Sequence, residues 1–162
     1  MATNIFAKLR AGVTTARAEE TRELARQFGQ ALPADSTLAL HGDLGVGKTT
    51  FVQGLARGLG VRDAVTSPTF TIFTLHRGPT TLLHLDAYRL ETARQVEDLL
   101  LEEFMISPWC LAVEWPDKIS SWLPAAALHL DLGIAPDERH TLRLREILRR
   151  VSAGPRPSPH HD

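Results

Sequence analysis

One short stretch, HGDLGVGKTTF at residues 41–51, constrains the fold of this chain more than any other feature. It matches the pattern G-x-x-x-x-G-K-[ST] at every fixed position from Gly42 to Thr49. A mostly apolar run (36–42) precedes it and a helical pattern (48–60) follows it, which is the strand–loop–helix context that the pattern requires. Glycines let several backbone N–H groups approach phosphate oxygens, and the helix N-terminus adds more donors. We therefore predict a binding site for a nucleoside triphosphate.

The side chains within this loop predict individual roles. Lys48 should reach the outer phosphates as a mobile point charge. The hydroxyl of Thr49 should bind Mg²⁺, whereas Thr50 should either support the loop or contact a phosphate. Guanine-specific proteins of this class usually carry Asn-Lys-x-Asp; the nearest string here is WPDK, which favours ATP. The nucleotide contacts expected from this loop are Gly42, Asp43, Leu44, Gly45, Val46, Gly47, Lys48, Thr49 and Thr50.

Two carboxylates follow apolar runs that read as strands, and hydrolysis of a triphosphate requires such groups. Asp86 ends the run LLHLD, and Glu114 follows CLAV. In parallel sheets, ligands gather at the carboxyl ends of the strands, and there a carboxylate can help to hold Mg²⁺ or orient a water. We predict that Glu114 and Lys48 are catalytic and that Thr49, Glu114 and Asp86 lie by the metal. The simpler alternative for each carboxylate is a cap at the end of its strand.

Other polar residues near these positions have two interpretations each. Ser67 and Thr69 flank a proline, and their hydroxyls either sense the γ-phosphate or Mg²⁺ or only cap turns. Trp115 belongs either to the core or to the nucleotide site. Arg89 either pairs with Asp86 or approaches a phosphate. His84 faces the same side of its strand as Asp86, and we expect it to be a packed histidine.

Hydrophobic periodicity predicts one domain over residues 1–150 and a disordered tail over 151–162, whose paired histidines we do not assign to a metal. We expect a loose leader at 1–9, helices at 18–32, 48–60, 91–104 and 117–123, strands at 10–16, 36–42 and 109–114, and hairpins at 70–90 and 126–147. Strand–helix alternation flanked by hairpins predicts an α/β fold. It would be a three-layer sandwich, like that of P-loop NTPases, with a mixed, partly antiparallel sheet.

Charge and composition narrow the choice of partners and compartment. The formal net charge is −1, which argues against a chain that holds nucleic acid on its own. No apolar stretch approaches the ~20 residues of a membrane span, and the first residues lack the apolar core of a signal peptide. The single cysteine, Cys110, excludes an internal disulfide and should be a core residue. We expect a protein of a reducing, cytoplasmic compartment.

Four strings in this order resemble the bacterial TsaE proteins, formerly YjeE: GDLGVGKTTFVQGLARGLG, VTSPTFTIF, HLDAYRL and VEWPDKISSWLP. The resemblance covers residues 15–145 and implies a small cytoplasmic P-loop ATPase that uses ATP and Mg²⁺. TsaE proteins serve the formation of N6-threonylcarbamoyladenosine at position 37 of tRNAs that read ANN codons. The resemblance implies the proteins TsaB and TsaD as partners, with tRNA reached indirectly through their complex.

Matching the motifs residue by residue implies an individual role for each of these candidates. The resemblance implies that Lys48 and Thr49 bind phosphate and Mg²⁺, that Glu114 serves hydrolysis and that Asp86 lies by the metal. It also places Trp115 near the nucleotide and makes the loop at 67–70 a switch. The chain departs from the family pattern in Val46, where alanine is frequent, and in Asp117, where EWPE becomes EWPD. The second change leaves a secondary contact in doubt.

Two other functions are compatible with a P-loop in a chain of this size. A small-molecule kinase usually carries an arginine-rich lid over the acceptor, and no such cluster lies between the candidate strands. The arginines at 143, 145, 149 and 150 come late in the chain. A nucleotide sensor would bind ATP tightly and release no phosphate.

Overall fold

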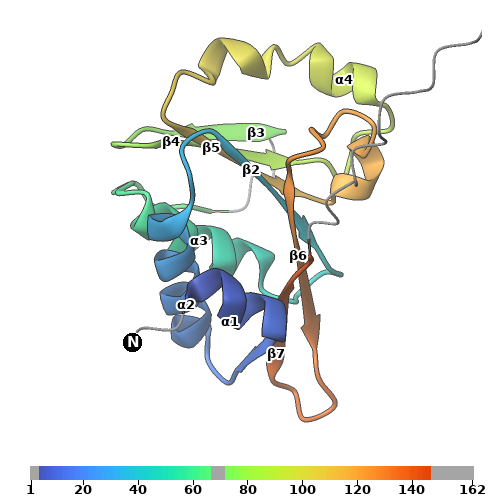
Figure 1. The fold of residues 1–162 in the computed structure, drawn as a ribbon. Helices are drawn as coiled ribbons and strands as arrows, with labels where there is room; N and C mark the ends of the chain where they lie inside the picture. The colour runs from blue at the N-terminus through green and yellow to red at the C-terminus, as the bar shows by residue number, and fades with distance from the viewer. Residues whose placement is uncertain (1–3, 67–71, 147–162) are drawn as a thin grey trace, which may run out of the picture.

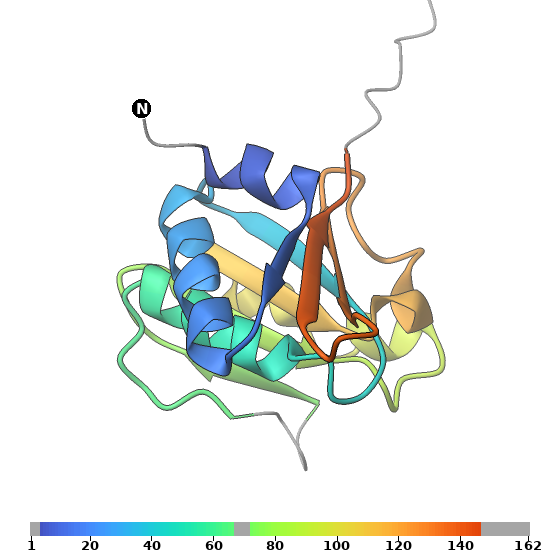
Figure 2. The same cartoon turned by 90° about the horizontal axis from the view of Figure 1, so that it is seen from below.

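The computed structural model describes residues 4–66 and 72–146. Within these ranges the strands form one seven-stranded sheet in the order β1-β7-β6-β2-β5-β4-β3. The strands are β1 (Val13–Thr15), β2 (Ser36–His41), β3 (Phe73–His76), β4 (Thr81–Asp86), β5 (Trp109–Glu114), β6 (Leu128–Ile134) and β7 (His140–Leu144). In Figure 2, β1 lies beside β7 at one edge of the sheet, next to the N-terminal helix.

The sheet is mixed because a parallel centre is flanked by antiparallel strands. β6, β2, β5 and β4 run parallel to one another, whereas β3 pairs antiparallel with β4, and β7 pairs antiparallel with β6 and with β1. The central strands are buried along nearly their whole length, as strands covered on both faces should be. Their carboxyl ends meet at one edge, where Glu114 is in register with Leu40 on one side and with Asp86 on the other.

Helices cover both faces of the sheet, which gives three layers (Figure 1). One face carries α1 (Ile5–Ala11), α2 (Ala18–Ala31) and α3 (Lys48–Gly58), and the other carries α4 (Ala93–Glu97) with the 3₁₀ helices η1 (Leu101–Phe104) and η2 (Pro116–Ile119). Strand side chains alternate between two cores: Leu38 and Leu40 pack with α1–α3, whereas Leu83 and Leu85 pack with α4, η1 and η2. The predicted three-layer α/β sandwich is confirmed.

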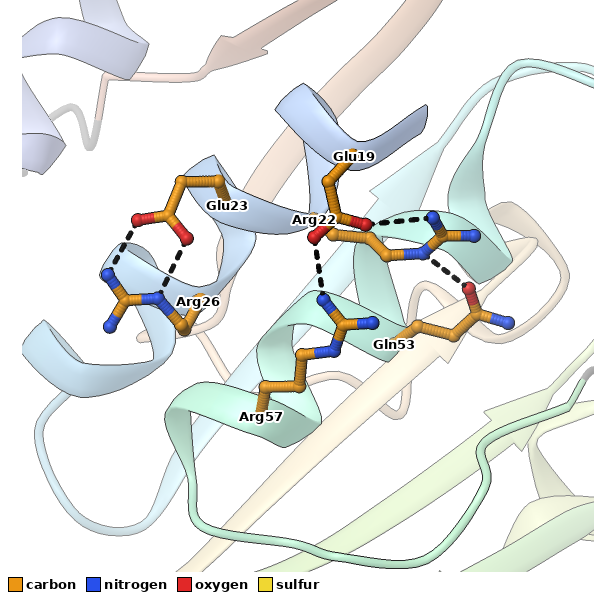
Figure 3. A network of polar contacts seen from close by, with 6 residues as sticks. All are labelled: Glu19, Arg22, Glu23, Arg26, Gln53 and Arg57. Carbon is orange, nitrogen blue, oxygen red and sulfur yellow. Dashed lines mark hydrogen bonds and ion pairs between the residues drawn. The ribbon is translucent and has the colours of Figure 1, made fainter. Parts of the chain in front are cut away.

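Helices α2 and α3 cross closely because α3 carries a glycine at the crossing. A Cβ at Gly54 would overlap the backbone of Arg22 on α2. At the surface, Arg22 donates to Glu19 and to Gln53, while Arg57 of α3 donates to Glu19 (Figure 3). Glu23 and Arg26 make a second pair within α2, and burial at the crossing stabilises the helix pair more than these exposed ion pairs do.

Most predicted elements are confirmed, and one expectation about the N-terminus is wrong. The strands at 10–16, 36–42 and 109–114, both hairpins and the helices at 18–32 and 48–60 all appear. Residues 5–9, expected in a loose leader, begin helix α1. The side chain of Asn4 caps this helix by accepting from the N–H of Phe6 at 2.9 Å, and Ile5 and Leu9 are buried. Two buried side chains one turn apart anchor this segment.

The predicted helix at 91–104 is also wrong as a continuous element. The α-helix ends at Glu97, Leu100 takes a left-handed conformation with φ 55°, and a 3₁₀ helix follows. Val96 and Leu101 both reach the core, although five residues of regular helix would turn them about 140° apart. The break lets both side chains be buried. Likewise, the short helix expected at 117–123 is a 3₁₀ helix at Pro116–Ile119.

Cys110 is buried in β5, as predicted, and burial raises the pKa of its thiol to about 12. In the described ranges, no helix is long and apolar enough to cross a membrane. The expected tail at 151–162 and the expected switch at 67–70 lie outside the described residues.

Candidate active site

A cavity of about 330 Å³ lies where the carboxyl ends of β4 and β5 meet the P-loop and the start of α3. Predicted residues from three separate parts of the sequence line it together. Its lining is Leu44, Gly45, Gly47, Lys48, Thr49, Thr50, Asp86, Glu114, Trp115 and His140. The other three predicted contacts, Gly42, Asp43 and Val46, line a neighbouring cavity of about 520 Å³, which shares Leu44 and Trp115 with the first.

The P-loop takes a conformation that requires glycine. Gly45 and Gly47 have φ values of 81° and 98°, which side chains rarely adopt. Gly42 has φ 147°, and a Cβ there would lie 2.6 Å from the carbonyl oxygen of Leu132. Helix α3 begins directly after Gly47, and no side chain caps it. Its first N–H groups are therefore available to an anion, and the helix dipole favours negative charge at this point.

Lys48 is almost fully buried beside the loop that it follows. Its ammonium group donates to the carbonyl oxygen of Gly42 at 2.5 Å and lies 3.6 Å from the centre of the Trp115 ring. Burial lowers the pKa of Lys48, and the charges of Glu114 and Asp86 partly oppose that shift. A phosphate would offer this cation a stronger partner than a carbonyl and an aromatic ring.

Trp115 lines the cavity and is not enclosed in the core. Its backbone is left-handed, with φ 56° and ψ 52°. Its ring contacts the Lys48 ammonium on the one hand and the Tyr88 ring, at 5.0 Å between centres, on the other.

Asp86 and Glu114 are direct neighbours in the register of β4 and β5. Asp86 accepts a hydrogen bond from the N–H of Tyr88 at 3.0 Å, and within the described chain no ion pair joins it to Arg89. Glu114 is only 4% exposed. His84 is fully buried, as expected of a packed histidine, but its Nε2 lies 2.6 Å from Oε2 of Glu114.

Comparison with known protein families identifies the family to which this chain belongs. The family model of the threonylcarbamoyl adenosine biosynthesis protein TsaE matches residues 15–143. The chain belongs to the TsaE family.

Relatives named tRNA threonylcarbamoyladenosine biosynthesis protein TsaE support the same family. The protein of Treponema pallidum is 35% identical over 120 residues, which cover 74% of this chain and 89% of the relative. That of Bacillus subtilis is 37% identical over 134 residues, which cover 82% and 84%. The crystal structure of Bacillus subtilis YdiB is similar with a TM-score of 0.66 and 32% identity, and the match covers 81% of each chain.

The donors of this TsaE family member fit a divalent cation that a bound nucleotide helps to hold. Asp86, Glu114 and the hydroxyl of Thr49 line one cavity. In the part of the chain that the structure describes, no group of three or more His, Cys, Asp or Glu side chains could bind a metal by itself. Mg²⁺ usually takes one or two carboxylates and completes its shell with phosphates and water, so this donor set fits it.

Sequence reasoning missed His140, which the fold brings to the P-loop from 94 residues away. Its Nδ1 lies 2.9 Å from the carbonyl oxygen of Val46, and its ring lies against Gly47. His140 begins β7, opposite Ile134 of β6. No local pattern could have shown this contact, because it depends on the pairing of β6 with β2 beside the loop.

Proposed function

We propose that this chain is a Mg²⁺-dependent ATPase that acts as an accessory factor in forming the threonylcarbamoyl group on adenosine 37 of tRNAs that read ANN codons. Membership of the TsaE family supports the pathway. The observation that carries the ATPase is the single cavity that Lys48, Thr49, Asp86 and Glu114 line at the P-loop.

Each residue then has a defined task. The P-loop amides and Lys48 hold the phosphates, and Lys48 leaves the Gly42 carbonyl to do so. Thr49 and the carboxylate of Asp86 would hold Mg²⁺, which neutralises phosphate charge when bound. Glu114 accepts a hydrogen bond from the attacking water, and so orients it toward the γ-phosphate. Burial of Glu114 keeps bulk water from competing for its carboxylate.

Turnover by the isolated protein should be slow. Among the described residues, Lys48 is the one cation that lines the cavity, and no arginine does so. The charge that develops in the transition state is therefore incompletely stabilised. We propose that TsaB and TsaD complete the site and that tRNA is reached through their complex, in keeping with a net charge of −1. The missing arginine also disfavours a small-molecule kinase.

ATP hydrolysis with and without the TsaB–TsaD pair tests this proposal. Lys48→Ala should lose ATP binding, whereas Glu114→Ala should bind ATP in calorimetry but lose about a hundredfold in turnover. Glu97→Ala removes an exposed carboxylate of α4 that does not line the cavity, and it is the matched control. A Glu114→Ala variant that hydrolyses ATP at the wild-type rate would show that the assignment is wrong.

A cellular measurement tests the pathway separately from the chemistry. Bulk tRNA from cells that lack this protein should lose N6-threonylcarbamoyladenosine. The wild-type chain should restore the nucleoside and Lys48→Ala should not. Unchanged nucleoside content in the deletion strain would contradict the assigned pathway while leaving the ATPase test intact.

A further inference from the structure

One buried polar side chain beside the cavity has no task in the proposed hydrolysis. His84 of β4 is fully buried, and its neighbour in register on β5 is Ala112. The small alanine leaves room for the imidazole to lie across β5 and reach Glu114 two residues further along. There Nε2 and Oε2 lie 2.6 Å apart.

The partner of the ring fixes the direction of this hydrogen bond. The carboxylate of Glu114 can only accept, so Nε2 of His84 must donate. The other ring nitrogen, Nδ1, is buried and has no hydrogen-bond partner among the described residues. Nε2 is therefore the nitrogen through which the ring contacts Glu114.

Glu114 and Lys48 have separate hydrogen-bond partners. Lys48 is close enough for the Glu114 charge to affect its pKa, yet no ion pair within 4.0 Å joins these two described residues. Glu114 contacts His84, and Lys48 contacts the Gly42 carbonyl. One carboxylate oxygen is thereby fixed, and Lys48 stays free for phosphate.

We propose that His84 is a positioning residue for Glu114. Its Nε2–H holds Oε2 of the carboxylate and leaves the other oxygen to orient the attacking water. The inference rests on the proposed ATPase function. Because a hydrolytic water must be aligned closely, a carboxylate that loses this hydrogen bond should bind substrate normally but react slowly.

Two amide substitutions separate this role from packing. The amide nitrogen of glutamine can occupy the place of Nε2, whereas that of asparagine reaches only the place of Nδ1, which has no hydrogen-bond partner in the described part of the chain. His84→Gln should keep kcat for ATP hydrolysis within about threefold of wild type. His84→Asn and His84→Leu should lose about tenfold or more. ATP affinity by calorimetry should change less than about threefold in all three. Equal kcat for the Gln and Asn variants, or a Leu variant with wild-type kcat, would overturn the proposal.

Glu114→Ala and a double variant separate failure of this inference from failure of the proposed function. If Glu114→Ala hydrolyses ATP normally, the ATPase assignment itself is wrong. If it loses turnover and His84→Leu does not, only the role of His84 is wrong. His84→Leu should cause no further loss in the Glu114→Ala background, because it acts through that carboxylate. Thermal unfolding confirms that each variant is folded, and if the Leu variant fails to fold, the Gln and Asn pair decides.

Discussion

The ammonium group of Lys48 lies 3.6 Å from the centre of the Trp115 ring, and both residues line the same cavity. The two residues come from α3 and from the end of β5, and a left-handed backbone at Trp115 accompanies the contact. Since the following Pro116 starts η2, this residue is also where the chain leaves the sheet. The aromatic ring thus gives the P-loop lysine a partner that a phosphate can replace.

The left-handed conformation at Trp115 predicts an unusual order of stability between two variants. Both Trp115→Ala and Trp115→Gly lose the contacts with Lys48 and Tyr88. Alanine retains the strain of a positive φ, which costs a non-glycine residue about 1–2 kcal/mol, and glycine does not. The Gly variant should therefore have the higher free energy of unfolding by about 1 kcal/mol in urea denaturation. Equal values would mean that the left-handed backbone carries no strain.

Gly54→Ala should destabilise the protein, although the same change in the interior of a helix usually adds about 1 kcal/mol of stability. A Cβ at this position would overlap the backbone of Arg22, so α2 and α3 would have to separate. We expect a loss of about 1–3 kcal/mol in the free energy of unfolding. Gln30→Ala, at an exposed position on α2, is the control and should change it by less than about 0.5 kcal/mol. A stabilised Gly54→Ala would contradict the close crossing.

Local patterns predicted the elements that have a strong periodicity of their own. The P-loop with β2 and α3, and the strands that end at Asp86 and Glu114, follow from apolar runs and punctuating residues. Parallel pairing then brings their carboxyl ends to one edge. The interrupted helix after Thr92 could not be predicted, because the break depends on which side chains the second core accepts.

Contacts that depend on strand register could likewise not be predicted from the sequence. Alternation placed His84 on the same side as Asp86, but the hydrogen bond to Glu114 needs the pairing of β4 with β5. His140 reaches the P-loop only because the β6–β7 hairpin is joined to β2. Such long-range pairings depend on the whole sheet, so a short segment of sequence does not predict them.

A pair of histidines predicts loss of stability in mild acid. Nε2 of His41 lies 2.8 Å from Nδ1 of His129. Burial lowers the pKa of both rings, as does the charge of Arg145, while Asp117 and Asp131 oppose the shift. The pKa of each ring is lower in the folded state than its value of 6.5 in the unfolded chain. Below about pH 6.5 the unfolded chain therefore binds more protons than the folded chain. Stability is therefore full above pH 6.5 and falls as the pH drops below it.

The free energy of unfolding should accordingly decrease from pH 7 to pH 5. Each imidazole contributes at most about 1.4 kcal/mol per pH unit. In urea denaturation at several pH values, His129→Gln should show a shallower decrease than wild type. Some slope should remain, because burial also lowers the pKa of His76. An unchanged pH profile in His129→Gln would mean that the pair does not govern acid stability.

His140 should stabilise the nucleotide-binding form of the P-loop. It makes its contact through the ring nitrogen that His84 leaves without a partner. Here the contacting atom is Nδ1, 2.9 Å from the Val46 carbonyl, so Nδ1 donates. The amide nitrogen of asparagine can take the position of Nδ1, whereas the longer side chain of glutamine places its amide nitrogen beyond that position. Loss of one such hydrogen bond, worth about 1 kcal/mol, should weaken ATP binding about fivefold in His140→Gln and His140→Ala. His140→Asn should bind ATP nearly as tightly as wild type in calorimetry.

Two outcomes would contradict this prediction. If all three variants bind ATP equally well, the loop holds its shape without the hairpin. If the Gln variant binds ATP as wild type and the Asn variant does not, the ring contacts the loop through its other nitrogen.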